Sequence, residues 1–135
     1  MAETAAAVAD THALLFHAAG GARLGRKAAA HFSACEQRKA ILYVPAVVVW
    51  ESALLARAGR VNLRRSVRSF FDDLFSNPAY QPYDLTAEHV RLGEELRINR
   101  DPFDALICAV AVDLQLPLIT RDAAIRDSGR VRVIW

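Results

Sequence analysis

The chain has 135 residues, of which 53% are hydrophobic and 24% are charged, and its formal net charge is +2. This length and composition predict a single domain over residues 1–135 that buries a core without a disulfide or a structural metal. The longest apolar stretch, Ala40 to Trp50, contains Pro45 and is too short to cross a bilayer, which excludes a membrane-spanning protein. A net charge this small does not by itself indicate a nucleic-acid-binding protein.

The N-terminal segment and the cysteines bear on location. Glu3 to Ala9 contains an acid and lacks a basic region, so it does not resemble a signal peptide. Cys35 and Cys108 lie far apart with no CxxC spacing, which indicates neither a disulfide framework nor a zinc site. We therefore expect a protein of the reducing cytoplasm.

Strand-like and helix-like stretches alternate in the first half of the chain. In order, we predict a buried strand, a short helix, an amphipathic helix, a second strand and a third helix: Ala5 to Ala9, Thr11 to Ala18, Leu24 to Arg38, Ile41 to Val44, and Pro45 to Gly59. The apolar face of the third helix is predicted to contain Val47, Trp50, Leu54 and Leu55.

The second half continues the alternation. We predict a helix, a short extended piece, two further helices, a strand, one or two helical turns and a last strand: Arg64 to Ser76, Tyr80 to Leu85, Thr86 to Arg97, Phe103 to Leu114, Leu116 to Thr120, Asp122 to Asp127, and Val131 to Trp135. Thr86 is the expected N-cap of one helix, and Asp101-Pro102 opens the next. Continuous apolar strands separated by helices indicate an α/β sandwich with a mainly parallel sheet and helices on both faces.

Four carboxylates lie close to the carboxyl ends of the predicted strands, where functional groups gather in open parallel sheets. Asp10 directly follows the first strand, and Asp122 follows the Leu116 to Thr120 strand after one residue. Glu51 is in the second turn of the helix after the second strand, and Asp104 is in the first turn of its helix. Clustered carboxylates repel one another unless a cation neutralises them, and Mg²⁺ or Mn²⁺ suits oxygen ligands.

Each acid also has a simpler explanation. Asp10 and Asp122 fit helix caps, and Asp104 fits a first-turn carboxylate favoured by the helix dipole. Glu51 shares the inward face of its helix with no Lys or Arg at helical spacing, so a metal or a distant arginine must compensate its charge. Asp104 shares its face with three apolar residues, Ile107, Cys108 and Ala111. Two inward acids and two acids at strand ends together favour a shared metal site.

The ordered combination of these motifs resembles the PIN-domain family, and within it the VapC-like toxins. The motifs are Asp10-Thr11 after a strand, Val49-Trp50-Glu51 in a helix, the run DPFDALICA at residues 101–109, and Thr120-Arg121-Asp122. The resemblance extends from Asp10 to Trp135 and implies a PIN-like three-layer sandwich. It also implies a small metal-dependent ribonuclease that pairs with an antitoxin protein and forms a homodimer.

The resemblance assigns roles to individual residues. It places the catalytic, metal-binding carboxylates at Asp10, Glu51, Asp104 and Asp122, with Thr11 and Thr120 as polar supports. Asp101 has no catalytic counterpart in the motif. Two positions depart from the pattern, since Ile125 stands where some relatives carry Phe and Ala46 where many carry Ser. Neither departure removes a carboxylate.

The resulting hypothesis is hydrolysis of RNA phosphodiester bonds assisted by Mg²⁺ or Mn²⁺, with single-stranded or looped RNA as substrate. A phosphatase with a nucleophilic Asp10 is an alternative, but Thr11 and His12 follow where such enzymes carry a DxD motif. A non-catalytic protein-interaction module of the same fold is a second alternative. An intact set of inward carboxylates argues against that module.

Arginines and aromatic residues leave further alternatives open. Fifteen of the seventeen basic residues are arginine. Three roles are open for five of these arginines, which are RNA binding, binding of an acidic antitoxin segment, or solvation of a helix face. The five are Arg57, Arg60, Arg64, Arg65 and Arg68. Six aromatic residues form either a partner groove or, for most of them, the core: Trp50, Phe70, Phe71, Phe75, Tyr80 and Tyr83. The four histidines lack ligand spacing and are assigned no chemistry.

Overall fold

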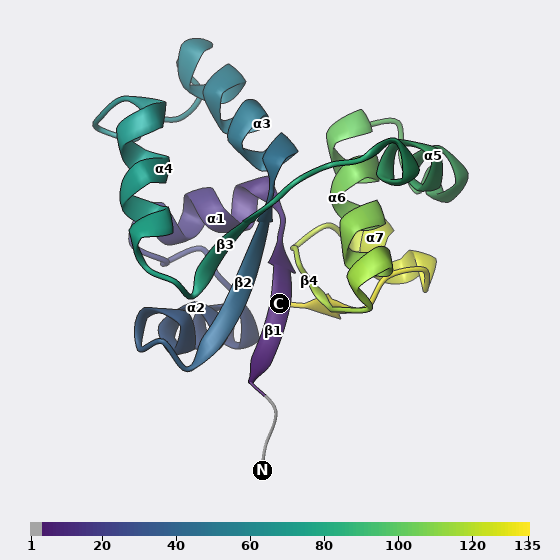
Figure 1. Cartoon of the computed structure of the whole chain (residues 1–135), viewed down its shortest axis with the longest axis horizontal. Helices are drawn as coiled ribbons and strands as arrows, with labels where there is room; N and C mark the ends of the chain where they lie inside the picture. The colour runs from purple at the N-terminus through teal and green to yellow at the C-terminus, as the bar shows by residue number, and fades with distance from the viewer. Residues whose placement is uncertain (1–3) are drawn as a thin grey trace.

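The computed structural model describes residues 4–135. The first three residues of the predicted domain, Glu3 among them, lie outside the described part. Five strands form one sheet in the order β3-β2-β1-β4-β5, and every neighbouring pair is parallel. The strands are β1 (Ala5–Ala9), β2 (Ala40–Pro45), β3 (Tyr80–Tyr83), β4 (Leu118–Ile119) and β5 (Val133–Ile134). The central position of β1 places its carboxyl end in the middle of one edge of the sheet (Figure 1).

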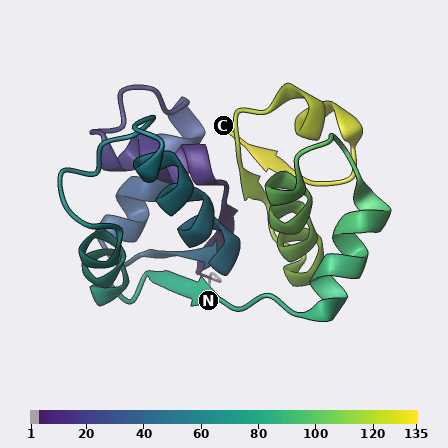
Figure 2. The same ribbon diagram turned by 90° about the horizontal axis from the view of Figure 1, so that it is seen from above.

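Seven helices connect these strands in the described residues 4–135. They are α1 (Thr11–Ala18), α2 (Arg26–Glu36), α3 (Ala46–Arg57), α4 (Val67–Ser76), α5 (Ala87–Leu96), α6 (Pro102–Leu114) and α7 (Ala123–Ser128). Figure 2 shows the helices of the first half gathered on one side of the molecule and those of the second half on the other. The predicted α/β architecture, a parallel sheet flanked by helices, is confirmed.

Most predicted elements are present, but some of their bounds differ. β1 and α1 have the predicted bounds, because Asp10 both ends the strand and caps the helix. The predicted helix from Arg64 begins only at Val67, since Arg64 has a φ of 62° and Ser66 is the N-cap. The last two strands are shorter than predicted, and Pro117, which directly precedes β4, has no N–H to extend the ladder.

The core surrounds the central strand. Ala7, Val8 and Ala9 of β1 are fully buried, as expected for a strand covered on both faces. Most of the predicted core aromatic residues are inside, with Phe70, Phe71 and Tyr80 buried and Phe75 and Tyr83 half-buried. In residues 4–135, no helix combines the length and apolar character needed to cross a membrane.

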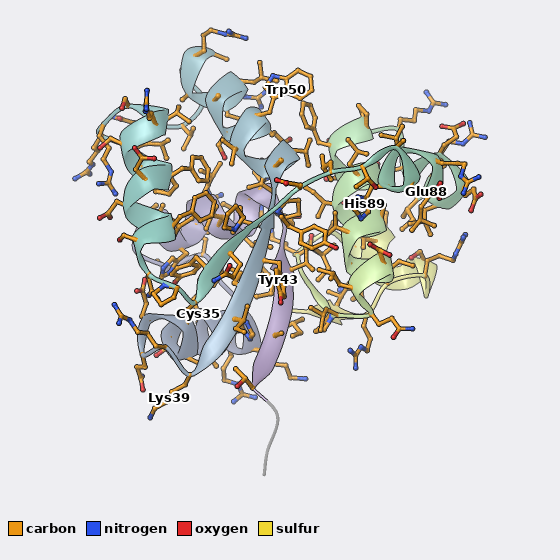
Figure 3. The ribbon with its side chains drawn as sticks, in the orientation of Figure 1. Cys35, Lys39, Tyr43, Trp50, Glu88 and His89 are labelled. Carbon is orange, nitrogen blue, oxygen red and sulfur yellow. The ribbon has the colours of Figure 1, made fainter. Side chains whose placement is uncertain are left out.

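The predicted inward position of Trp50 is wrong. The buried arc of α3 passes through Val47, Val48 and Ser52, and Trp50 lies outside this arc with 59% of its surface exposed (Figure 3). Its indole meets the Phe103 ring of α6 edge-on, with centroids 5.2 Å apart. Trp50 therefore contacts the neighbouring helix instead of the core.

Candidate functional site

Asp10 lies where β1 meets α1, and both of its carboxylate oxygens are engaged. Oδ1 accepts a hydrogen bond from the Ala13 N–H at 3.1 Å, which caps α1. Oδ2 accepts a hydrogen bond from the Thr120 hydroxyl at 2.6 Å. Only 8% of Asp10 is exposed, so these two donors replace most of its hydration. The helix-cap explanation of Asp10 is confirmed, and the same carboxylate also lies at the centre of the sheet edge.

Thr120, at the end of β4, connects Asp10 to Asp122. Its hydroxyl oxygen accepts a hydrogen bond from the Asp122 N–H at 3.1 Å while its hydrogen is donated to Asp10. Asp122 caps α7 by accepting from the Ile125 N–H at 3.0 Å. The side chain of Ile125 is buried, so the departure from Phe at this position keeps an apolar anchor under the cap. The predicted supporting role of Thr120 is thus seen as two hydrogen bonds.

Asp104 is held by a residue that the sequence did not single out. The side-chain amide of Asn99 donates to Asp104 Oδ2 at 2.9 Å, and Asn99 Oδ1 accepts from the Asp101 N–H at 2.8 Å. The pKa of Asp104 is raised to about 6, first by burial and then by the nearby charges of Asp101, Asp10 and Asp122, against the opposing effect of the Asn99 hydrogen bond. The raised pKa of Asp104 therefore reflects its burial beside other negatively charged groups.

Four aspartates surround one hollow of about 330 Å³. Its lining also contains an arginine, a histidine, a threonine and two aromatic residues; the complete set is Asp10, His12, Ala13, Phe16, Asp101, Asp104, Thr120, Arg121, Asp122 and Trp135. Asp101 caps α6 by accepting from the Phe103 N–H at 2.9 Å, as predicted, and also contributes to the negative charge here. Three of the four predicted site carboxylates thus line one space.

Glu51 lies beside this hollow and is absent from its lining. It is half-buried on α3, and burial raises its pKa, with the charges of Asp101 and Asp10 acting in the same direction. The Thr11 hydroxyl is near enough to oppose this rise, but the two groups do not form a hydrogen bond of normal geometry. Thr11 Oγ1 is a buried side-chain oxygen left without a hydrogen-bond partner in residues 4–135.

The donor set suits a hard divalent cation. None of the ion pairs found in the described chain includes Asp10, Glu51, Asp101, Asp104 or Asp122. Burial and, after it, the mutual repulsion of these groups raise the pKa values of Asp104 and Glu51, and a cation would relieve the repulsion. As the side chains stand, no three potential ligands among residues 4–135 converge on a single point.

The other charged candidates lie elsewhere. Arg57, Arg60 and Arg64 are exposed, whereas the exposed Arg65 and Arg68 pair with carboxylates of α4. These arginines therefore remain a prediction as a binding surface. Of the histidines, His89 has a structural role instead: its ring completes the capping box of α5 with Thr86.

A sequence model of the PIN domain matches residues 7–130. The chain belongs to the PIN domain family. Proteins of this family are generally nucleases, and they generally use divalent metal ions. The match includes all four aspartates of the hollow, from Asp10 to Asp122. No curated protein matches the sequence.

Solved structures share the fold of this PIN domain at low sequence identity. It is similar to VapBC2 from Rickettsia felis bound to a promoter DNA fragment, with a TM-score of 0.68 and 13% identity, covering 96% of this chain and 97% of that one. It is also similar to a toxin-antitoxin complex from Klebsiella pneumoniae, with a TM-score of 0.63, 17% identity and 96% of each chain covered. The similarity to FitAcB from Neisseria gonorrhoeae has a TM-score of 0.63 and 16% identity, and it covers 95% of this chain and 96% of that one.

Proposed function

We propose that this PIN domain is an endoribonuclease that depends on Mg²⁺ or Mn²⁺ and cleaves single-stranded or looped RNA. The observation that carries the proposal is a group of carboxylates around one hollow that form no ion pair with an arginine or lysine of the described residues. Asp10, Asp104 and Asp122 are the proposed ligands and catalytic residues, and Glu51 joins them from the side of α3. A bound cation would activate water and stabilise the leaving oxygen.

The protein's own groups hold these carboxylates in place. Thr120 orients Asp10 through its hydroxyl, and Asn99 orients Asp104 through its amide. The Ala13 N–H donates to one oxygen of Asp10, and the Ile125 N–H donates to one oxygen of Asp122. Held in this way, the charges face the hollow before a substrate arrives, which lowers the reorganisation needed for catalysis.

The biological setting is proposed from the related structures. Toxin-antitoxin assemblies appear among the structures of the same fold, which supports a toxin role with an antitoxin protein as partner. A cytoplasmic location, a homodimeric state and a single domain over residues 1–135 belong to the same proposal. The arginines between positions 57 and 68 are offered as contacts to RNA or to the antitoxin.

Cleavage of RNA by the purified chain tests the proposal. A circular RNA with an unpaired loop, which has no ends, is incubated with Mg²⁺ or Mn²⁺ and with a chelator. We expect metal-dependent linearisation that Asp104→Asn abolishes and that Asp72→Asn, on the exposed face of α4, leaves unchanged. A chain that binds no metal and cuts none of several RNAs would instead be a protein-interaction module. Cutting that survives both the chelator and Asp104→Asn would contradict the assigned site.

A further inference from the structure

Two arginines lie against one aromatic ring beside the acidic hollow. The guanidinium carbon of Arg23 lies 4.7 Å from the centroid of the Phe16 ring, and that of Arg121 lies 4.9 Å from the same centroid. Because both guanidinium groups lie this close to the same centroid, they are also close to each other. Contact with the ring face stabilises each cation without neutralising it. Two positive charges are thus held together on one residue of α1.

The ring that carries them is fixed in place. Phe16 is only 8% exposed, and it meets the indole of Trp135 nearly edge-on, with centroids 6.3 Å apart. The Trp135 carbonyl accepts a hydrogen bond from the Ala28 N–H at 3.0 Å, which fixes the end of the chain to α2. His12 packs on the ring from the preceding turn of α1, at 6.4 Å. A rigid base of this kind limits the freedom that the arginines lose when they bind a ligand.

Neither arginine is paired with a carboxylate, although carboxylates are close. Arg121 lines the same hollow as four aspartates and directly precedes Asp122. The ion pairs within residues 4–135 nevertheless include neither Arg23 nor Arg121, and both side chains are exposed. Their N–H donors are therefore available to an anion from solution, and a planar guanidinium suits a phosphate in particular.

We propose that Arg23 and Arg121 bind the phosphate backbone of a single-stranded nucleic acid and position it at the acidic hollow. This inference rests on the proposed function and adds the residues that hold the strand. The aspartates of the hollow repel a polyanion, so a strand can approach only where nearby cations offset this repulsion. The two arginines supply that charge at the rim. They are positioning residues, and the carboxylates retain the chemistry.

The salt dependence of binding tests this assignment without any cleavage. A fluorescent ten-nucleotide single-stranded RNA is titrated with the wild-type chain in chelator, and anisotropy is followed over a series of NaCl concentrations. We expect Arg23→Gln and Arg121→Gln each to weaken binding about tenfold and to reduce the slope of log K against log salt by about 0.7. In the metal-supplemented cleavage reaction, the same variants should raise KM and leave kcat nearly unchanged.

Matched variants test whether Arg23 and Arg121, together called the arginine clamp, act through their position or only through their charge. Arg38→Gln removes an exposed arginine that forms no ion pair within residues 4–135 and lies near the opposite end of the sheet, before β2 begins. This variant should leave the slope unchanged. Phe16→Leu keeps an apolar residue but removes the ring, and should weaken binding while both charges remain. Thermal unfolding of each variant reports whether it is folded. Equal slopes for Arg38→Gln, Arg23→Gln and Arg121→Gln would overturn the proposal.

The outcomes also distinguish this inference from the proposed function. Arginine-dependent RNA binding by a chain that never cleaves RNA would overturn the nuclease and keep the clamp. Metal-dependent cleavage by a chain whose RNA binding does not depend on the two arginines would keep the nuclease and overturn the clamp. If the two variants lose affinity for a poly-glutamate peptide and keep their affinity for RNA, the arginines serve an acidic protein partner, and the clamp proposal is wrong.

Discussion

Thr120 and Asp10 are 110 residues apart in the sequence, and the Thr120 hydroxyl donates a 2.6 Å hydrogen bond to Asp10 Oδ2. The contact joins the ends of the adjacent parallel strands β1 and β4. Both residues are buried, so the hydrogen bond lies in a medium of low dielectric constant, where it is strong. The sheet thus brings one carboxylate and its support together from the two ends of the chain.

Thr120→Val should weaken both the fold and the site. The variant removes the donor to Asp10 and the acceptor for the Asp122 N–H while nearly keeping the side-chain volume. We expect a loss of about 1–3 kcal/mol in the free energy of unfolding, because a buried carboxylate oxygen and a half-buried N–H each lose a partner. Thr120→Ser, which keeps the hydroxyl, should stay within about 1 kcal/mol of the wild type. Urea unfolding of both variants measures this, and equal stability of Thr120→Val and wild type would contradict it.

Asp104→Asn should stabilise the metal-free protein. The folded-state pKa of Asp104 is raised to about 6 from 3.8, so the folded protein holds a proton that the unfolded chain releases at lower pH. The contribution of this group to stability is therefore fully present below about pH 4 and is lost as pH rises through about 6. Above that pH, removing the charge should raise the free energy of unfolding by about 1–2 kcal/mol, after allowance for partial exposure.

Unfolding of Asp104→Asn and wild type in chelator, from pH 4 to pH 8, measures this difference. The Asn99 amide can still donate to the new side chain, so the local hydrogen bond is kept. The gap between the two proteins should open between about pH 4 and 6 and then stay constant. A variant that is less stable than wild type at pH 7 would show that Asp104 is not under electrostatic strain.

Gly25→Ala should disrupt the contact that fixes the last residue to α2. A Cβ at this position would lie closer than any normal contact to the carbonyl oxygen of Trp135, which is backbone and cannot move aside alone. We expect a loss of about 2–3 kcal/mol, as for other overpacked sites. Lys27→Ala, two residues along the same helix and exposed, is the control. Chemical unfolding compares the two, and an unchanged midpoint for Gly25→Ala would refute the close approach.

His89→Ala should destabilise α5 and its packing on α6. The buried ring of His89 on α5 (Figure 3) accepts a hydrogen bond from the Thr86 N–H at 2.9 Å, and its other nitrogen lies 2.8 Å from Asp113 Oδ2. Nδ1 is therefore the acceptor, and Nε2–H donates to the carboxylate. We expect a loss of about 2–4 kcal/mol on removing the ring, and little change for Glu88→Ala beside it on the exposed face. Similar unfolding midpoints for the two variants would contradict this role.

The architecture was accessible from sequence where one residue served two elements. Asp10 ends a strand and caps a helix, and Thr86 opens α5 as predicted. The start of α4 was missed because the left-handed backbone at Arg64 leaves no pattern in side-chain polarity. The exposure of Trp50 was missed because its apolar character is used against Phe103 rather than in the core.

The candidate site was predictable in its residue types and less so in its contacts. Strand order and parallel direction suffice to bring Asp10 and Asp122 to one edge of the sheet. The Asn99–Asp104 hydrogen bond could not be predicted, although an Asn two residues before a capping Asp is a signal for a local turn. The positions of Arg23 and Arg121 on Phe16 depend on the packing of three separate segments, which periodicity does not reveal.

Calorimetric titration of Mn²⁺ into the metal-free chain tests most directly whether the carboxylates form one cation site. The wild type should show saturable binding that is lost in both Asp104→Asn and Asp10→Asn and kept in Asp72→Asn. Because Asp104 must lose its proton to bind the ion, affinity should rise as pH increases through about 6. Binding of equal strength in wild type, Asp10→Asn and Asp104→Asn would contradict the site.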